Sequence, residues 1–154
     1  MERADLKRAG LLCINFNLRK AARAVTAIFD RNLAPIGITS TQFSVMVGLA
    51  YYPGHSMSAL AQFLVMDRTT LTKNLKPLMR DKLIELSEGE DKRQRLLQLS
   101  KKGRALLDKA FPLWTEAQQQ VSEVLGGEGE MHGLYRSLHK VSSRLMKSEL
   151  ALKN

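Results

Sequence analysis

The chain has only one cysteine, Cys13, among its 154 residues. A single cysteine excludes an internal disulfide framework and a thiolate cluster for zinc, which agrees with a reducing compartment. No apolar run approaches the roughly 20 residues that a membrane-spanning helix needs, and residues 1–8 are charged rather than signal-like. We therefore expect a soluble, intracellular protein with no membrane partner.

The sequence also lacks the motifs of the common enzyme classes. It has no glycine-rich phosphate loop, no Ser/His/Asp order with a recognisable elbow, and no paired carboxylates in a plausible pocket context. Its three histidines, His55, His132 and His139, do not have the spacing of a metal site, and no cysteine or acidic cluster joins them. We expect a protein that is not an enzyme, with no metal and no cofactor.

Charge is absent from residues 41–65 and concentrated on either side of them. The net charge is +9 and the pI about 9.9. Residues 1–40 carry seven Lys and Arg against three acids, residues 66–104 carry eleven against six, and residues 105–154 carry six of each. A basic surface favours an anionic partner. The largest basic excess coincides with the segment that contains the motif described next.

Residues 58–104 have the order of parts of a winged helix-turn-helix. Ser58 is the expected cap of a first short helix, and Asp67 is the expected N-cap of a second. Two short apolar strands, residues 83–87 and 96–99, then flank a charged tip. The predicted fold class is mainly α with a small β wing, a winged helix-turn-helix flanked by long N- and C-terminal dimerisation helices.

The second helix of this motif has two opposed faces. Leu75 and Leu78 lie within about 40° of Leu71 at the 3.6-residue period. The opposite pole carries hydroxyl and basic side chains: Thr69, Lys73, Lys76 and Arg80. Pro77 conflicts with a regular helix because it removes a backbone hydrogen bond. We expect a kink there and not an end.

Amphipathic helices are predicted on both sides of the motif. Apolar residues at spacings of three and four predict a helix from Leu11 to Leu33, ended by Pro35 and Gly37. A capping box of Thr39 and Gln42 predicts an uncharged helix over residues 40–51, either buried on most sides or covered by a second chain. A turn follows over residues 51–55.

The C-terminal third is also predicted to be helical. Ser100 is the expected cap of a long helix, with a bend at Pro112. Four glycines are expected to form a loop: Gly126, Gly127, Gly129 and Gly133. The last helix has an apolar seam typical of helix–helix packing: Leu134, Leu138, Val141, Leu145 and Leu152. Two long apolar stripes at the two chain ends favour a homodimer, and the alternative is that they pair within one chain.

Five fragments taken together resemble the MarR family of bacterial transcriptional regulators. They are Gly-Ile-Thr-x-x-Gln-Phe at 37–43, Leu-Ala at 60–61, Asp-Arg-Thr-Thr-Leu-Thr at 67–72, Asp-Lys-Arg at 91–93 and Leu-Ser-Lys-Lys-Gly-Arg at 99–104. The resemblance covers roughly residues 11–125. It implies a dimeric winged-helix protein that binds pseudo-palindromic double-stranded DNA operators and usually represses. It places the protein in the bacterial cytoplasm, associated with the nucleoid when bound.

We accordingly expect one domain over residues 1–154. Residues 1–36 and 105–154 are the expected dimerisation helices, and residues 37–104 the DNA-binding lobe. In a helix-turn-helix the second helix enters the major groove, which predicts base or near-base contacts from its polar face: Thr69, Thr70, Thr72 and Lys73. Arg68 and Lys76 are predicted to touch phosphates. At the wing, Arg93 is the candidate for the minor groove, held by Asp91, with Lys92 and Arg95 on phosphate.

The resemblance also implies a small aromatic or lipophilic effector, often an anion, between the dimer helices and the winged lobe. The predicted pocket residues are Arg23, Phe29, Phe43, Met46, Tyr51, Phe111 and Trp114. An alternative is a thiol-based redox repressor that uses Cys13. The peroxide-sensing branch of the family is not matched, since Asn15 stands at its reactive cysteine and Phe29 at its tyrosine. A further alternative is a winged-helix scaffold that binds protein and not DNA.

Overall fold

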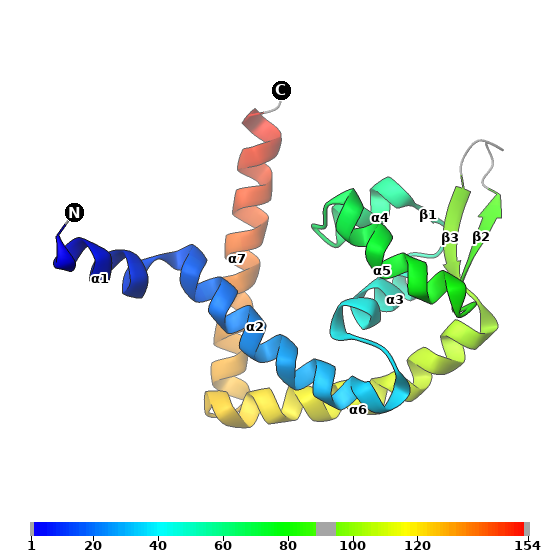
Figure 1. Cartoon of the computed structure of the whole chain (residues 1–154), viewed down its shortest axis with the longest axis horizontal. Helices are drawn as coiled ribbons and strands as arrows, with labels where there is room; N and C mark the ends of the chain where they lie inside the picture. Colours follow the sequence, from blue (N-terminus) through cyan, green and yellow to red (C-terminus); the bar gives the residue numbers. More distant parts are fainter. Residues whose placement is uncertain (1, 89–94, 153–154) are drawn as a thin grey trace. The chain divides into compact units, whose positions relative to one another are not determined.

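A computed structural model describes residues 2–88 and 95–152 as a mainly helical chain with a small β-sheet (Figure 1). The expected fold class, mainly α with a small β wing, is confirmed. The elements in chain order are α1 (Arg3–Leu12), α2 (Ile14–Leu33), η1 (Ala34–Ile36), α3 (Ser40–Tyr51), β1 (His55–Ser56), α4 (Met57–Phe63), α5 (Arg68–Arg80), β2 (Ile84–Glu88), β3 (Arg95–Leu99), α6 (Lys101–Leu125) and α7 (Glu128–Leu152). Two compact units are formed, Met1–Glu116 and Ala117–Asn154. Among the described residues no single helix is long and apolar enough to cross a membrane; α2 and α3 reach that length and composition only as a pair bent by 77°.

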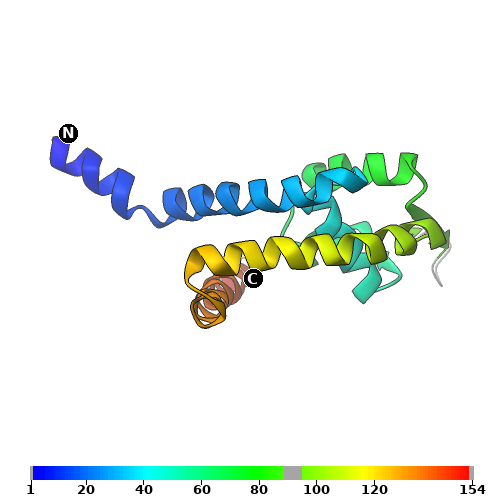
Figure 2. The same cartoon turned by 90° about the horizontal axis from the view of Figure 1, so that it is seen from below.

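The first long helix is interrupted at Cys13, so the prediction of one helix from Leu11 to Leu33 is wrong at its start (Figure 2). Cys13 has extended backbone angles, φ −69° and ψ 112°, and separates α1 from α2. The side-chain amide of Asn17 donates to the carbonyl oxygens of Leu11 at 2.9 Å and Cys13 at 3.0 Å. These bonds satisfy carbonyls at the end of α1, which stabilises the break.

The helix α3 has the bounds and the capping box predicted for it. The Thr39 hydroxyl accepts from the Gln42 backbone N–H at 3.2 Å, and the Gln42 side chain accepts from the Thr39 N–H at 2.9 Å. Five of its twelve residues are buried, whereas Val47 is 40% and Tyr51 71% exposed, so one side of the uncharged helix is not covered within this chain. Its buried residues are Phe43, Val45, Met46, Gly48 and Leu49.

The sheet has three strands in the order β1-β3-β2, all antiparallel. The predicted wing strands are present as β2 and β3, while β1 was not predicted. Its pairing with β3 moves the start of α4, so that Ser56 and not Ser58 is the cap. Ser56 has extended backbone angles and its hydroxyl accepts from the Ala59 N–H at 3.2 Å. Ser58 lies inside α4.

The main core lies in the first unit, where α3, α4 and α5 pack with the sheet. The predicted core face of α5 is confirmed, because its three leucines are at most 1% exposed. Pro77 lies inside this helix without ending it. The buried core residues are Leu33, Ile38, Phe43, Val45, Met46, Leu49, Leu60, Leu71, Leu75, Leu78, Leu83, Ile84, Leu97, Leu99 and Ala110.

The two C-terminal helices are joined by a turn of only two residues. Ser100 caps α6 as predicted, because its hydroxyl accepts from the Gly103 N–H at 3.0 Å. The predicted four-glycine loop is wrong: Gly126 and Gly127 form the turn with φ of 99° and 106°, whereas Gly129 and Gly133 lie in α7. Only the first two glycines have the left-handed backbone that a side chain disfavours.

Candidate nucleic-acid interface and ligand cavity

The start of α5 is fixed by Asp67, the predicted N-cap. Its carboxylate accepts from the Thr70 backbone N–H at 2.8 Å and from the Thr70 hydroxyl at 2.6 Å. These hydrogen bonds, the hydroxyl first, hold the pKa of the Asp67 carboxyl below its usual value. Since the Thr70 proton is donated to Asp67, the Thr70 oxygen is left to accept hydrogen bonds from a partner.

The outer face of α5 is polar and basic, as its sequence indicated. Thr69, Lys73 and Lys76 are exposed on the side opposite the buried leucines, and Arg68 is exposed in the first turn of the helix. Thr72 is half-buried, and its hydroxyl donates to the Arg68 carbonyl oxygen at 2.7 Å. The structure therefore brings six of the predicted DNA-contact residues onto one helix, with the protons of Thr70 and Thr72 already engaged.

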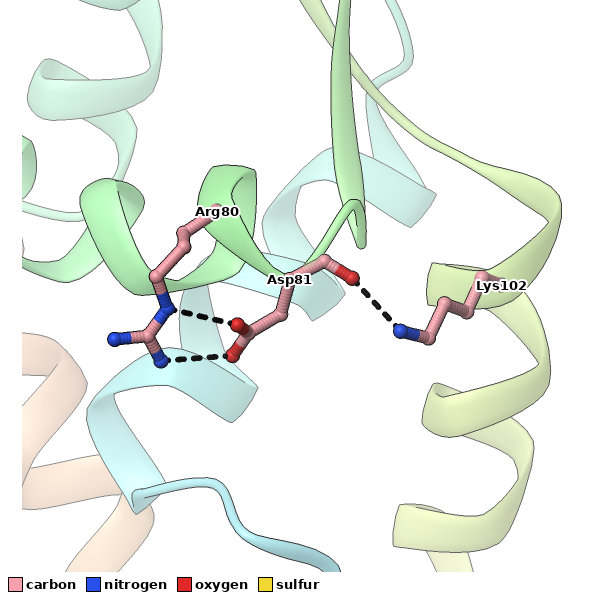
Figure 3. Close-up of polar contacts among 3 residues, drawn as sticks. All are labelled: Arg80, Asp81 and Lys102. Carbon is pink, nitrogen blue, oxygen red and sulfur yellow. Dashed lines mark hydrogen bonds and ion pairs between the residues drawn. The ribbon is translucent and has the colours of Figure 1, made fainter.

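At the end of α5, an ion pair joins two neighbouring residues and a lysine of α6 contacts the same turn (Figure 3). The Arg80 guanidinium donates to both Asp81 carboxylate oxygens, at 2.8 and 3.1 Å. These bonds lower the pKa of Asp81 and raise that of Arg80. The Lys102 ammonium on α6 donates to the Asp81 carbonyl oxygen at 2.9 Å. An exposed ion pair stabilises a fold little, so we interpret this cluster as positioning the turn before the wing.

The base of the wing is held closely by α6. The Ser100 hydroxyl donates to the Lys82 carbonyl oxygen at 2.7 Å, and the Ser100 N–H donates to that of Leu83 at 3.0 Å. Arg95 begins β3, with its backbone paired to Glu88. The other predicted wing contacts, Asp91, Lys92 and Arg93, lie outside the described residues, and their roles stay predictions.

A cavity of about 630 Å³ lies in the first unit beside the helix-turn-helix. Four of the seven predicted pocket residues line it: Phe29, Phe43, Phe111 and Trp114. The other three do not. Met46 is fully buried in the core, Tyr51 is 71% exposed and packs edge-on against Tyr52, and Arg23 is exposed on α2 outside the lining.

The remaining lining residues were not found from the sequence. Ser40, Ser44 and Val47 of α3 follow one another at spacings of four and three, so the helical period could have placed them on one face. Phe63, Leu64 and Met66 could not have been found in this way, because they belong to another helix and its following turn. The rest of the lining is Val25, Thr26, Thr41 and Gly48.

Cys13 lies away from this cavity, at the break between α1 and α2. Its side chain is exposed, and a shallow pocket formed with Asp5, Arg8, Ala9 and Leu12 lies beside it. Its proposed redox role stays a prediction.

Comparison with known proteins gives one consistent family. The model of the MarR family matches residues 36–94. The HTH-type transcriptional repressor NicR of Pseudomonas putida is 31% identical over 111 residues, which are 71% of this chain and 68% of NicR.

Two solved structures are similar over most of their length. The crystal structure of the M. tuberculosis transcriptional regulator MosR in complex with DNA is 35% identical, with a TM-score of 0.72, and the match covers 86% of this chain and 98% of MosR. The transcriptional repressor CouR bound to a 23-mer DNA duplex is 26% identical, with a TM-score of 0.78, covering 92% and 98%. CouR has also been solved bound to p-coumaroyl-CoA, at 25% identity and a TM-score of 0.77.

Proposed function

Because this chain belongs to the MarR family and is a DNA-binding transcriptional regulator, we propose that it is a homodimeric repressor released from a pseudo-palindromic operator by a small-molecule effector. The observation that carries the proposal is the placement of the polar face of α5 and the cavity in one compact unit. The turn between α4 and α5 contributes to both, because Leu64 and Met66 line the cavity and Asp67 caps α5.

In this proposal, the turn between α4 and α5 couples the cavity to the DNA-binding helix. Val65, between the two lining residues, has a φ of 51°, which a β-branched residue adopts only when its surroundings hold it there. Its N–H donates to the Gln62 carbonyl oxygen at 3.2 Å. A molecule that displaces Leu64 or Met66 would disturb this turn and hence the first residues of α5. We expect a change in the orientation of α5 relative to the major groove.

Exposed apolar side chains at both ends of the chain support the homodimer. Leu134, Leu138 and Leu145 of α7 are 39%, 41% and 61% exposed. At the other end, Leu11 and Ile14 are more than 60% exposed. Burying such surfaces against a second copy is favourable in proportion to the apolar area removed from water. A dimer would address two half-sites about 34–36 Å apart.

The proposal is tested by selecting genomic fragments that the full chain binds and measuring their affinity by fluorescence anisotropy. If each subunit neutralises three to five phosphates, affinity should fall by roughly 10³ to 10⁵ between low and moderate salt. Arg93→Ala should weaken specific binding by about 1–3 kcal/mol with the dimer intact. A variant that binds as tightly as the wild type would contradict the role assigned to the wing.

The thiol alternative has a separate test. If Cys13 is the switch, peroxide should release the wild type from its selected fragment and leave Cys13→Ser bound. If peroxide changes the DNA binding of the wild type and of Cys13→Ser equally, Cys13 is not a redox switch. The scaffold alternative predicts weak, salt-insensitive binding to every fragment.

A further inference from the structure

We infer that Thr70 of α5 contacts the amino group of a cytosine in the major groove, and that Asp67 sets this preference by engaging the Thr70 hydroxyl proton. The inference rests on the proposed entry of α5 into the major groove and names the base that the first turn of the helix selects. Asp67 acts through Thr70, so it is a positioning residue.

Thr70 lies where a helix of this kind meets the bases. In a helix-turn-helix, the N-terminal residues of the second helix contact base edges. Thr70 is in the first turn of α5, and it is exposed. The next residue, Leu71, is fully buried, so the backbone of this turn is packed against the core. The position of Thr70 is therefore fixed by packing as well as by the helix cap.

The polar groups of Thr70 are engaged within the helix, apart from one acceptor. The N–H donates to one Asp67 carboxylate oxygen at 2.8 Å, and the hydroxyl donates to the other at 2.6 Å. The carbonyl oxygen accepts from the Asn74 side-chain amide at 2.9 Å. The hydroxyl oxygen can still accept a hydrogen bond, so the Thr70 side chain offers the groove an acceptor and no donor.

The hydroxyl proton is held by a strong hydrogen bond. A distance of 2.6 Å is typical of a bond from a hydroxyl to a carboxylate, which is roughly twice as strong as one between neutral groups. The Thr70 hydroxyl first, and the Thr70 N–H second, lower the pKa of Asp67, so its carboxylate is ionised near neutral pH and has no proton to donate. Turning the hydroxyl toward an acceptor on a base would break this bond.

Cytosine is the base whose edge fits these acceptors. In the major groove guanine presents two acceptors, thymine presents an acceptor and a methyl group, and adenine presents an acceptor beside its amino group. Cytosine presents its N4 amino donor with no acceptor beside it. The Thr70 hydroxyl oxygen and the neighbouring Asp67 carboxylate would repel the acceptors of the other three bases.

Lys73 supplies the opposite kind of group about one turn further along α5. It is exposed, and its ammonium can only donate hydrogen bonds. The guanine that pairs with cytosine carries the O6 and N7 acceptors that arginine and lysine contact most often in the major groove. An acceptor followed by a donor on the same helix therefore matches a C·G base pair.

The test measures base preference with the full chain. Fluorescence anisotropy gives the affinities of the wild type and of Thr70→Val for every single base-pair variant of a selected fragment. The position at which Thr70→Val changes the preference identifies the base that Thr70 faces. There the wild type should prefer C·G over T·A by roughly 5- to 100-fold.

Removal of the amino group alone is a sharper measurement. Replacing this cytosine by 2-pyrimidinone, which lacks the amino group, should weaken binding of the wild type by roughly 2- to 10-fold. The same replacement should weaken binding of Thr70→Val less, because valine has no acceptor to lose. Thr70→Ser keeps the hydroxyl and should respond as the wild type does.

Asp67→Asn tests the role of the carboxylate. Asparagine is as good an N-cap as aspartate, so α5 should keep its start. Its amide can donate to the Thr70 oxygen, which releases the Thr70 proton for an acceptor on the base. The preference for C·G over T·A should therefore be lost. Asp81→Asn removes the same charge at the other end of α5, away from Thr70, and should keep the wild-type preference.

Several results would overturn the inference. They are a preference for another base at this position, an equal effect of 2-pyrimidinone on the wild type and Thr70→Val, an unchanged preference in Asp67→Asn, and a Thr70→Val variant that changes no preference. Circular dichroism shows whether each variant folds, and the 2-pyrimidinone measurement does not depend on Asp67→Asn.

These results are distinguishable from failure of the proposed function. If no fragment can be selected, both the inference and the proposed function are contradicted. If fragments are selected without the cytosine preference, only the inference fails. A chain that prefers cytosine but is monomeric or insensitive to effectors would support the inference and contradict the repressor proposal.

Discussion

Gly103 is the position where one added carbon should damage the structure most directly. It lies in the first turn of α6, against the residue that precedes β2. A Cβ built there would lie 2.0 Å from the Leu83 carbonyl oxygen and 3.3 Å from the Leu99 side chain. The Leu83 oxygen cannot easily move away, since it accepts from the Ser100 N–H at 3.0 Å. Gly103→Ala must therefore separate α6 from the base of the wing.

The cost follows from the contacts that have to change. The Cβ and the Leu83 oxygen must move apart from 2.0 Å to at least 3.0 Å. Overpacking of this kind costs about 1–3 kcal/mol, and losing the Ser100 hydrogen bond costs about 0.5–1.5 kcal/mol more. Removing a glycine from a helix returns up to about 1 kcal/mol. We expect the free energy of unfolding to fall by about 1–3 kcal/mol.

Urea denaturation followed by far-ultraviolet circular dichroism measures this change. Gly129→Ala is the matched control, because Gly129 also lies in the first turn of a helix and a Cβ there has nothing within 4 Å. That variant should gain about 0.5–1 kcal/mol. If Gly103→Ala is as stable as the wild type, the close approach of α6 to Leu83 does not exist in solution.

Three further predictions concern DNA binding, pH and assembly. Lys76→Ala should lower the affinity for every selected fragment and reduce the slope of log affinity against log salt concentration by about 1. Arg80→Ala should reduce the affinity and the slope less, because Arg80 already pairs with Asp81. Equal effects of the two substitutions would contradict this prediction. Asp67→Ala should lower the melting temperature near neutral pH. Because the folded-state pKa of Asp67 is depressed, its contribution is present above its ordinary value of 3.8 and is lost as the pH falls through the folded value. The deficit of Asp67→Ala should shrink in acid, and a deficit independent of pH would refute the role of its charge. Leu138→Glu should give a monomer near 17.3 kDa by light scattering while the wild type has twice that mass; a monomeric wild type would exclude the homodimer.

Local signals in the sequence predicted the parts of the motif accurately. The leucine spacing of α5 identified its buried face, and the pairs Thr39–Gln42 and Asp67–Thr70 made the caps that such residues favour. These features depend on residues within one or two turns of each other. For the same reason the polar face of α5, the candidate DNA surface, was readable in advance.

Features that depend on distant segments were mispredicted or missed. Ser56 and Ser58 are both good caps, and only the pairing of β1 with β3 makes Ser56 the cap. Neither Cys13 nor its two neighbours is a proline or glycine, so no helix-ending residue predicted the break there. Hydrogen bonds from the Asn17 side chain stabilise it. Valine rarely has a left-handed backbone, so the residue type at position 65 did not predict the positive φ that Val65 has in the turn.

By itself, the sequence determined the order of the two motif helices and the two wing strands, and the two faces of the second helix, because helical periodicity and capping are local. The tertiary structure decided which aromatic side chains share a cavity and which do not. The four aromatic residues that line the cavity come from three helices: Phe29, Phe43, Phe111 and Trp114. Met46 is instead buried in the core, and Tyr51 is exposed at the surface. Neighbours across a cavity are set by how helices pack, and no spacing within one helix specifies that.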